Sequence, residues 1–246
     1  MNLTKTDKTT LTGLYIAKFD KEALTAFGFT GMWQAFNVIG YSLGSSPASI
    51  KNYRDEFDRL FPDNPRKGWQ RPLKTRSKKI FADFNALSFA AFTDLIKSFL
   101  IPHYEEEKEI AAVIKSDMNE SVAKRLITGK AAEEYFKITY PSIIEFENYD
   151  VKDTTNFACG FDFKLSLDSN FYCVEVKGLN ANSGNIILTE KEYVVASELR
   201  TQYCLFIVKN FVEKPSHQFF FDPLNAGLSF HRNERVVKQI HYSTLI

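Results

Sequence analysis

The sequence predicts an α+β protein with a helical N-terminal half and a C-terminal half built on a mixed central sheet flanked by helices. Apolar residues recur at helical spacing through most of the first 140 residues. After Pro141 the period of the apolar pattern changes from 3.6 to 2, which is typical of strands. A further helical pattern separates the last two strand-like runs. These observations favour two units, residues 1–110 and residues 111–246.

Composition limits the class of protein. The 246 residues are 44% hydrophobic and carry a net charge of +1, so the chain can bury a substantial core. No apolar stretch is long enough to span a membrane, and the opening "MNLTKTDKTTLTG" lacks the apolar run of a signal peptide. The three cysteines lie far apart and lack the spacing of a zinc site. We therefore expect a cytoplasmic protein that makes no contact with a membrane.

Two helices joined by a tight turn are expected within the first 60 residues. Helical spacing runs from Met32 to Leu43, "GSSP" interrupts it, and a second helix begins at Pro47 or Ala48 and continues to about Leu60. A serine of the turn can cap the second helix, and proline suits the first helical position. This is the outline of a helix-turn-helix, and the alternative is an ordinary αα-hairpin in a helical bundle.

A basic loop is expected after the helix pair. "RKGWQRPLKTRSKK", from Arg66 to Lys79, carries seven basic residues and no acid. Such a segment is typical of a surface that contacts phosphates, although a solvated linker has the same composition. Together, the helix pair and the basic segment predict binding to double-stranded DNA. The residues expected to contact it are Ser49, Lys51, Asn52, Arg54, Arg66, Lys67, Trp69, Arg71 and Lys74.

The remaining elements follow in order. "ALSFAAFTDLIKSFLIP" predicts a helix ended by Pro102, and the next stretch predicts one or two helices that end at Gly129. "KAAEEYFKITY" predicts a separate helix that stops before Pro141. Strands are expected in "SIIEFENYD", "FDFKLSL", "FYCVEVKG" and "QYCLFIVKNF". Between the last two strands, a helix is expected with Thr189 as its cap and Glu192 as the capping-box partner.

Three charges interrupt the strand-like runs. Alternation places Cys173, Glu175 and Lys177 on one face of their strand, and a hairpin brings Asp162 of the previous strand to the same side. Two carboxylates suit a hard divalent cation such as Mg²⁺, for which Mn²⁺ can substitute. We therefore expect Asp162 and Glu175 to bind a metal and Lys177 to assist chemistry at a phosphate. The alternative is a structural ion pair or a set of exposed charges.

The motif formed by these residues resembles that of a known nuclease superfamily. Gly-Phe-Asp, ending at Asp162, followed by Glu-Val-Lys at 175–177, is similar to the PD-(D/E)xK signature, although Phe161 stands where the name has proline. Residues 130–211 resemble more closely the nuclease-like domain at the C-terminus of NO VEIN proteins, through "TGKAAEEYF", "GFD…EVKG" and "ILTEKEY…A…YCLFIV". The resemblance implies a PD-(D/E)xK fold and a further acid on the preceding helix, with Glu133 the first choice and Glu134 the second.

These inferences point to a type II restriction endonuclease that hydrolyses double-stranded DNA, with Asp162, Glu175, Lys177 and Glu133 as catalytic residues and Mg²⁺ bound by Asp162 and Glu175. A cognate DNA methyltransferase would be its genetic partner, and a homodimer or two sequential nicks would cut both strands. Two alternatives remain open: a less specific repair or defence nuclease, and a non-catalytic DNA-binding regulator. The loop at Asn182 and Ser183 is a candidate DNA contact or a plain turn. Ordinary surface or core roles are expected for the C-terminal histidines, His217, His231 and His241.

Overall fold

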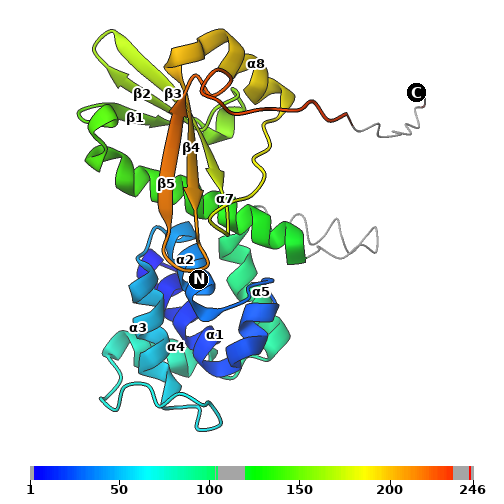
Figure 1. Cartoon of the computed structure of the whole chain (residues 1–246). Coiled ribbons are helices and arrows are strands. Elements are labelled where there is room, and N and C mark those ends of the chain that lie inside the picture. Colours follow the sequence, from blue (N-terminus) through cyan, green and yellow to red (C-terminus); the bar gives the residue numbers. More distant parts are fainter. Residues whose placement is uncertain (1–2, 103, 105–119, 235–243, 245–246) are drawn as a thin grey trace.

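The computed structural model describes residues 3–102, 104, 120–234 and 244 (Figure 1). Within them the chain forms seven α-helices and a five-stranded mixed sheet, which confirms the α+β prediction. The predicted boundary between residues 110 and 111 lies outside the described residues. Among the described residues, no helix combines the length and the apolar character that a membrane span requires.

Five helices form a layer at one end of the molecule (Figure 1). The predicted helix pair is present, and Ser46 caps its second helix by accepting a hydrogen bond from the Ser49 amide at 3.2 Å. This helix packs against the first helix of the chain. That first helix is not among the elements predicted from the sequence. The pair is therefore part of a bundle, and its role in DNA binding stays a prediction. The layer consists of α1 (Lys5–Thr25), α2 (Met32–Ser42), α3 (Pro47–Asp58), α4 (Thr75–Phe84) and α5 (Phe89–Leu100).

A long helix, α7 (Glu120–Thr139), runs between this layer and the sheet. The prediction that one helix ends at Gly129 and another begins beyond it is wrong, because α7 passes through Gly129 without a break. Glycine costs a helix about 1 kcal/mol relative to alanine, which tertiary packing can offset. Here α7 packs against α2 on one side and against the sheet on the other. Gly178 permits this close approach, because a Cβ there would lie 2.9 Å from the Thr128 carbonyl oxygen.

The sheet has the strand order β1-β2-β3-β4-β5. All neighbouring strands are antiparallel except β3 and β4, which are parallel and are connected through α8 (Glu190–Leu199). Two expectations fail: residues 144–146 of the predicted strand "SIIEFENYD" form a 3₁₀-helix, and the sequence pattern indicates no strand where β5 forms. The strands are β1 (Asp150–Asp153), β2 (Phe163–Leu167), β3 (Asn170–Gly178), β4 (Tyr203–Lys209) and β5 (Ser216–Phe221).

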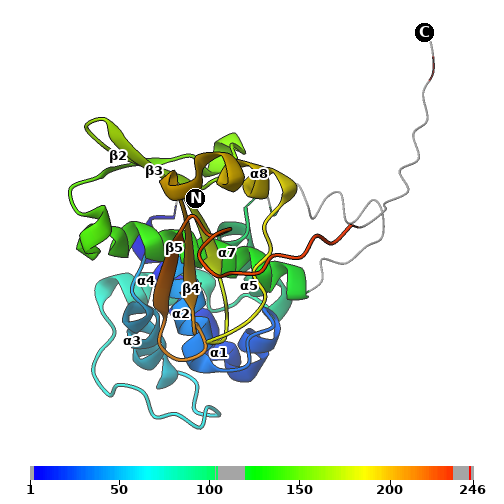
Figure 2. The ribbon, with the colours of Figure 1, turned by 45° about the horizontal axis from the view of Figure 1, so that its top comes forward.

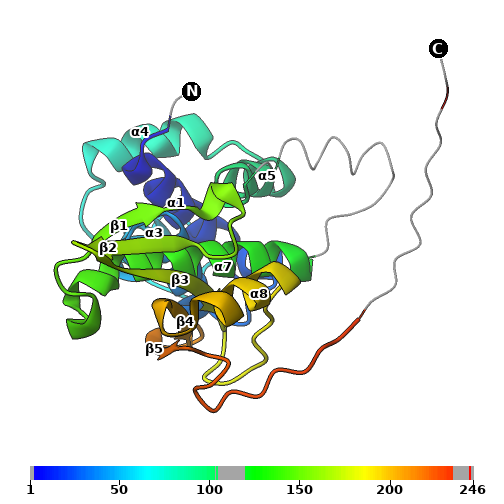
Figure 3. The ribbon, with the colours of Figure 1, turned by 90° about the horizontal axis from the view of Figure 1, so that it is seen from above.

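The two faces of the sheet are covered by different helices. On one face, the Phe136 ring of α7 lies 5.0 Å from Phe163 and 4.9 Å from Phe206, in a core continuous with the helical layer. On the other face, Cys173 belongs to a smaller cluster under α8. Figure 3 shows the sheet from the end opposite the helical layer, with α7 and α8 beside it. Phe161 packs in the smaller cluster rather than beside Phe163, because β2 begins only at residue 163.

Candidate active site

Asp162 lies where β2 begins and β3 continues past it. Its backbone amide donates to the Val174 carbonyl oxygen at 2.9 Å, and its Oδ2 accepts from the Val176 amide at 2.8 Å. β2 supplies no partner for this amide, so the carboxylate satisfies a strand hydrogen bond and is fixed in position. Gly160 enters this turn at φ +92°, and a Cβ there would lie 2.8 Å from the Val195 side chain on α8. The turn that presents Asp162 therefore requires glycine.

Glu175 and Lys177 project from β3 toward the α8 side of the sheet. The Lys177 ammonium lies 2.6 Å from the Glu175 carboxylate and 2.8 Å from the carboxylate of Glu192, in the first turn of α8. Glu192 also accepts from the Thr189 amide at 3.0 Å, so the predicted capping box forms and its glutamate also reaches the site. Burial alone would lower the pKa of Lys177, but these two carboxylates outweigh it and raise that pKa.

Glu133 approaches the same place from α7. Burial, followed by the charges of Asp162 and of Asp153 at the end of β1, raises its pKa to about 7. Burial raises the pKa of Asp162 to about 6. Burial and then the charge of Asp162 raise the pKa of Glu175, whose exposed fraction is 4%, to about 8. The structure therefore brings Asp162, Glu175 and Lys177 together, and it places Glu133 close enough to Asp162 for their charges to interact.

The cluster carries more negative than positive charge. Lys177 pairs with Glu175 and Glu192, and Lys137 pairs with Glu134 and lies 3.5 Å from Asp153. The charges of Glu133 and Asp162 act on each other beside these pairs. Carboxylate oxygens are the ligands that Mg²⁺ prefers, and a divalent cation would offset both the burial and the repulsion that raise the pKa values of Glu133 and Glu175. Among the described residues, no group of three or more His, Cys, Asp or Glu side chains is placed so that it could hold a metal ion. The donor set therefore fits a cation held through two carboxylates, with water and substrate oxygens as its other ligands.

Several residues expected to contact DNA are engaged within the protein. Arg54 is buried, pairs with Asp55 at 2.6 Å and Asp58 at 3.4 Å, and lies over the Phe36 ring. Arg66 pairs with the same Asp58 at 3.0 Å. These guanidinium groups stabilise the helical layer, so they do not present the free hydrogen-bond donors that readout of bases needs. Lys51 also pairs with Asp55, and Ser49 contacts the capping Ser46.

The rest of the expected DNA contacts lie on the surface. Asn52, Lys67, Arg71 and Lys74 are exposed, and the Arg71 guanidinium lies 3.8 Å from the centre of the half-buried Trp69 ring. Lys67, Trp69, Arg71 and Lys74 lie in the loop between α3 and α4, at the end of the molecule away from α8 (Figures 1 and 2). Asn182 and Ser183 are exposed in the loop that follows β3. The basic segment is helical from Thr75 onward, so the expectation of a loop through Lys79 is wrong.

Sequence reasoning assigns Glu192 to a helix cap and gives no role to Asp153 or Lys137. The sequence feature that could have indicated Glu192 is its position in the first turn of the helix that follows the strand with Glu175 and Lys177. For Asp153 the signal was weaker, an acid at the end of a strand opposite Phe163. His217 packs on the Phe206 ring at 5.0 Å and contacts the Tyr135 hydroxyl at 3.2 Å, away from the cluster. His231 is exposed, and His241 lies outside the described residues.

Comparison with known proteins gives one match. Residues 131–221 match the model of the family described as Protein NO VEIN, C-terminal, which is associated with PD-(D/E)xK-like nuclease domains. The matched segment contains Glu133, Asp162, Glu175, Lys177 and Glu192 but covers less than half of the chain. No curated protein and no solved structure matches the chain. The segment that carries the candidate site is thus similar to the C-terminal domain of NO VEIN proteins.

Proposed function

We propose that this protein is a metal-dependent endonuclease that hydrolyses phosphodiester bonds in double-stranded DNA, and that it acts as a type II restriction enzyme. One observation carries the proposal: Asp162, Glu175 and Lys177 lie together where β2 begins beside β3, and the charge of Glu133 on α7 acts on Asp162 there. Burying such a cluster for structure alone is costly and rarely stabilising. The family match over residues 131–221 supports the same reading.

Asp162 and Glu175 would hold Mg²⁺ or Mn²⁺. The ion, when bound, stabilises negative charge on a phosphate and lowers the pKa of a water molecule. Asp162 is fixed for this by the Val176 amide, and Glu175 by its ion pair with Lys177. The Lys177 ammonium would donate hydrogen bonds to the attacking water or to a phosphate oxygen, and Glu192 would orient it. Glu133 would act as an outer ligand or hold a proton, as its pKa of about 7 allows.

The experiment is plasmid cleavage beside a gel-shift assay on the same preparations. Cleavage should require Mg²⁺ or Mn²⁺ and stop in chelator, whereas Ca²⁺ should support binding without turnover. Asp162→Ala, Glu175→Ala and Lys177→Ala should each reduce the cleavage rate by at least about 100-fold while the protein still binds DNA. Glu133→Ala should reduce it less, and Glu134→Ala, which carries a matched charge change one residue away, less again. Undiminished cleavage in chelator, or by Lys177→Ala, would overturn the proposal.

A second candidate, a nuclease with less sequence specificity, is favoured by the engagement of Arg54 in intramolecular ion pairs. Without this guanidinium, α3 offers Asn52 as its exposed polar side chain for reading bases. Discrete bands from plasmid DNA would favour the restriction enzyme, and a gene for a DNA methyltransferase beside this one would support it. A continuous ladder of products would favour the less specific nuclease. Binding without cleavage under any metal would instead indicate a regulator.

A further inference from the structure

A cavity of about 480 Å³ lies between the first turn of α1, the end of α2, and α7. Three lysines line it: Lys5 and Lys8 from α1, and Lys130 from α7. One carboxylate, Glu134, faces them. Neither the sequence motifs nor the candidate active site accounts for this cavity, and it is large enough for a charged group of a ligand.

The charges of the cavity are not balanced within the described residues. Glu134 already pairs with Lys137, and no described carboxylate lies within ion-pair distance of the Lys8 or Lys130 ammonium. The Lys5 ammonium donates to the Gly44 carbonyl oxygen at 2.7 Å, and Lys8 lies over the Phe99 ring at 5.7 Å. The charges of Glu134 and Glu133 act on Lys130 without an ion pair, so these lysines keep hydrogen-bond donors available for an anion.

The cavity adjoins the candidate active site through α7. At 100° per residue, Lys130 and Glu134 lie on a helix face next to that of Glu133 and Lys137. Lys137 joins the two faces, because it pairs with Glu134 of the cavity and lies 3.5 Å from Asp153 of the carboxylate cluster.

The basic segment of α4 reaches the same end of α1. Arg76 pairs with Asp7 at 2.7 Å, in the same turn as Lys5 and Lys8. The cavity thus lies between the carboxylate cluster on one side and a basic helix on the other. A single free phosphate would use the cavity alone, whereas a polyanion would follow the whole path. The three lysines of the cavity, together with the exposed Lys78 and Lys79 of α4, favour the polyanion.

We infer that the cavity lined by Lys5, Lys8 and Lys130 binds a backbone phosphate of the nucleic-acid strand, close to the bond cleaved at the carboxylate cluster. The inference rests on the proposed function, since it names a further subsite for the same substrate. It also places the main electrostatic contact on α1 and α7 rather than on the distant loop that carries Lys67 and Arg71. Lys8 and Lys130 bind substrate in this view and take no part in the chemical step.

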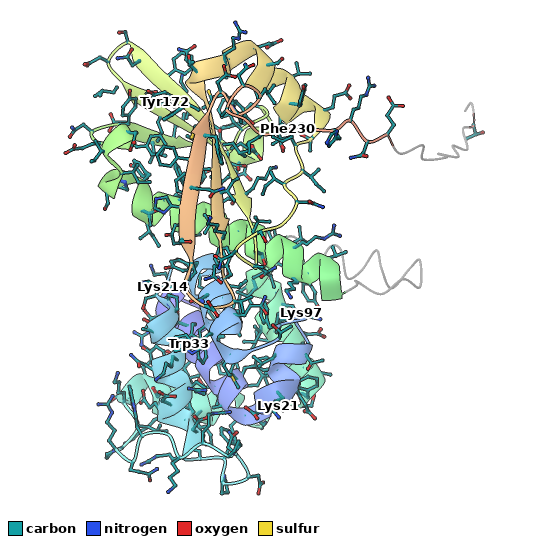
Figure 4. The ribbon with its side chains drawn as sticks, in the orientation of Figure 1. Lys21, Trp33, Lys97, Tyr172, Lys214 and Phe230 are labelled. Carbon is teal, nitrogen blue, oxygen red and sulfur yellow. The ribbon has the colours of Figure 1, made fainter. Side chains whose placement is uncertain are left out.

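The test uses the full-length protein, a short DNA duplex and Ca²⁺, at several salt concentrations. Lys8→Gln and Lys130→Gln should each weaken binding, and each should reduce the slope of log K against log salt by about one. Lys21→Gln is the matched control, because Lys21 is an exposed lysine on the same helix and lies at the end away from α7 (Figure 4). It should leave the slope unchanged. Thermal unfolding of each variant verifies that it is folded.

The outcomes separate this inference from the nuclease proposal. If the wild-type protein does not cleave DNA but Lys8→Gln and Lys130→Gln lose duplex affinity, the subsite stands and the nuclease proposal falls. If the wild type cleaves and both variants bind with the wild-type slope, the subsite is overturned. Inorganic pyrophosphate tests the free-phosphate alternative: stabilisation of wild type but not of Lys130→Gln, with duplex binding unchanged, would also overturn the nucleic-acid assignment.

Discussion

Replacing Asp162 by asparagine should abolish cleavage and yet stabilise the metal-free protein at alkaline pH. Asparagine keeps an oxygen that accepts from the Val176 amide, so the strand hydrogen bond survives. What disappears is a half-buried negative charge beside Glu133 and Glu175. The substitution therefore separates loss of function from loss of stability, because the charged carboxylate is needed to bind the metal but destabilises the folded protein when no metal is bound.

The magnitude follows from the pKa. Burial raises the pKa of Asp162 from 3.8 to about 6, which corresponds to about 3 kcal/mol at 1.36 kcal/mol per unit of pKa. A raised carboxyl pKa means that the folded state binds more protons than the unfolded chain, so stability falls as pH rises between these two values. The penalty is absent below about pH 4 and fully present above pH 6. Because this group titrates together with Glu133 and Glu175, we expect a gain of about 1–3 kcal/mol at pH 8.

The assay is thermal unfolding in chelator at pH 5 and pH 8. At pH 8 the melting temperature of Asp162→Asn should exceed that of the wild type by several degrees, since about 1 kcal/mol shifts it by about 2–4 °C in a chain of this size. The gain at pH 5 should be roughly half as large. Asp63→Asn, which removes an exposed acid outside the cluster, is the control and should change little at either pH.

Calcium supplies the complementary result. Saturating Ca²⁺ should stabilise the wild type at pH 8 and leave Asp162→Asn unaffected, because a ligand that binds the folded state stabilises it by mass action. If Asp162→Asn proved less stable than the wild type in chelator at pH 8, the carboxylate would be a structural group. Burial and repulsion at Asp162 would then not prepare this site for a cation.

Three further results are expected. Arg66→Gln should destabilise the protein by about 3 kcal/mol in urea unfolding, since it leaves the buried Asp58 with less compensation, and a variant as stable as the wild type would show that Arg66 is free to bind DNA instead. Glu192→Gln should reduce plasmid cleavage roughly tenfold, less than Lys177→Ala, because it removes one of two partners that orient the ammonium; an unchanged rate would make Glu192 a helix cap alone. Gly160→Ala should destabilise the protein by about 1–3 kcal/mol and impair cleavage, because the residue has a positive φ and a Cβ there would contact Val195. Unfolding and cleavage measurements on one preparation test this, and wild-type values of both would mean that the turn before β2 adapts to the added methyl group.

The sequence determined those features that depend on local periodicity and local caps. Helical spacing and the GSSP turn located α2 and α3, and Thr189 with Glu192 located the start of α8. Alternation along β3 placed Glu175 and Lys177 on one face, and the expected hairpin with the previous strand brought Asp162 to the same side. Each of these needs information from a few neighbouring residues, which a single sequence contains.

Tertiary structure decided the features that depend on partners far along the chain. Helix α7 continues through Gly129 because α2 and the sheet hold it from both sides. The sequence predicts Arg54 and Arg66 as DNA contacts, but in the structure both form ion pairs with Asp58 inside the helical layer. The lysine cavity likewise joins α1 to α7 across more than a hundred residues. A charged side chain has the same appearance in sequence whether it faces solvent or an opposite charge, and only the packing of distant elements determines which partner it meets.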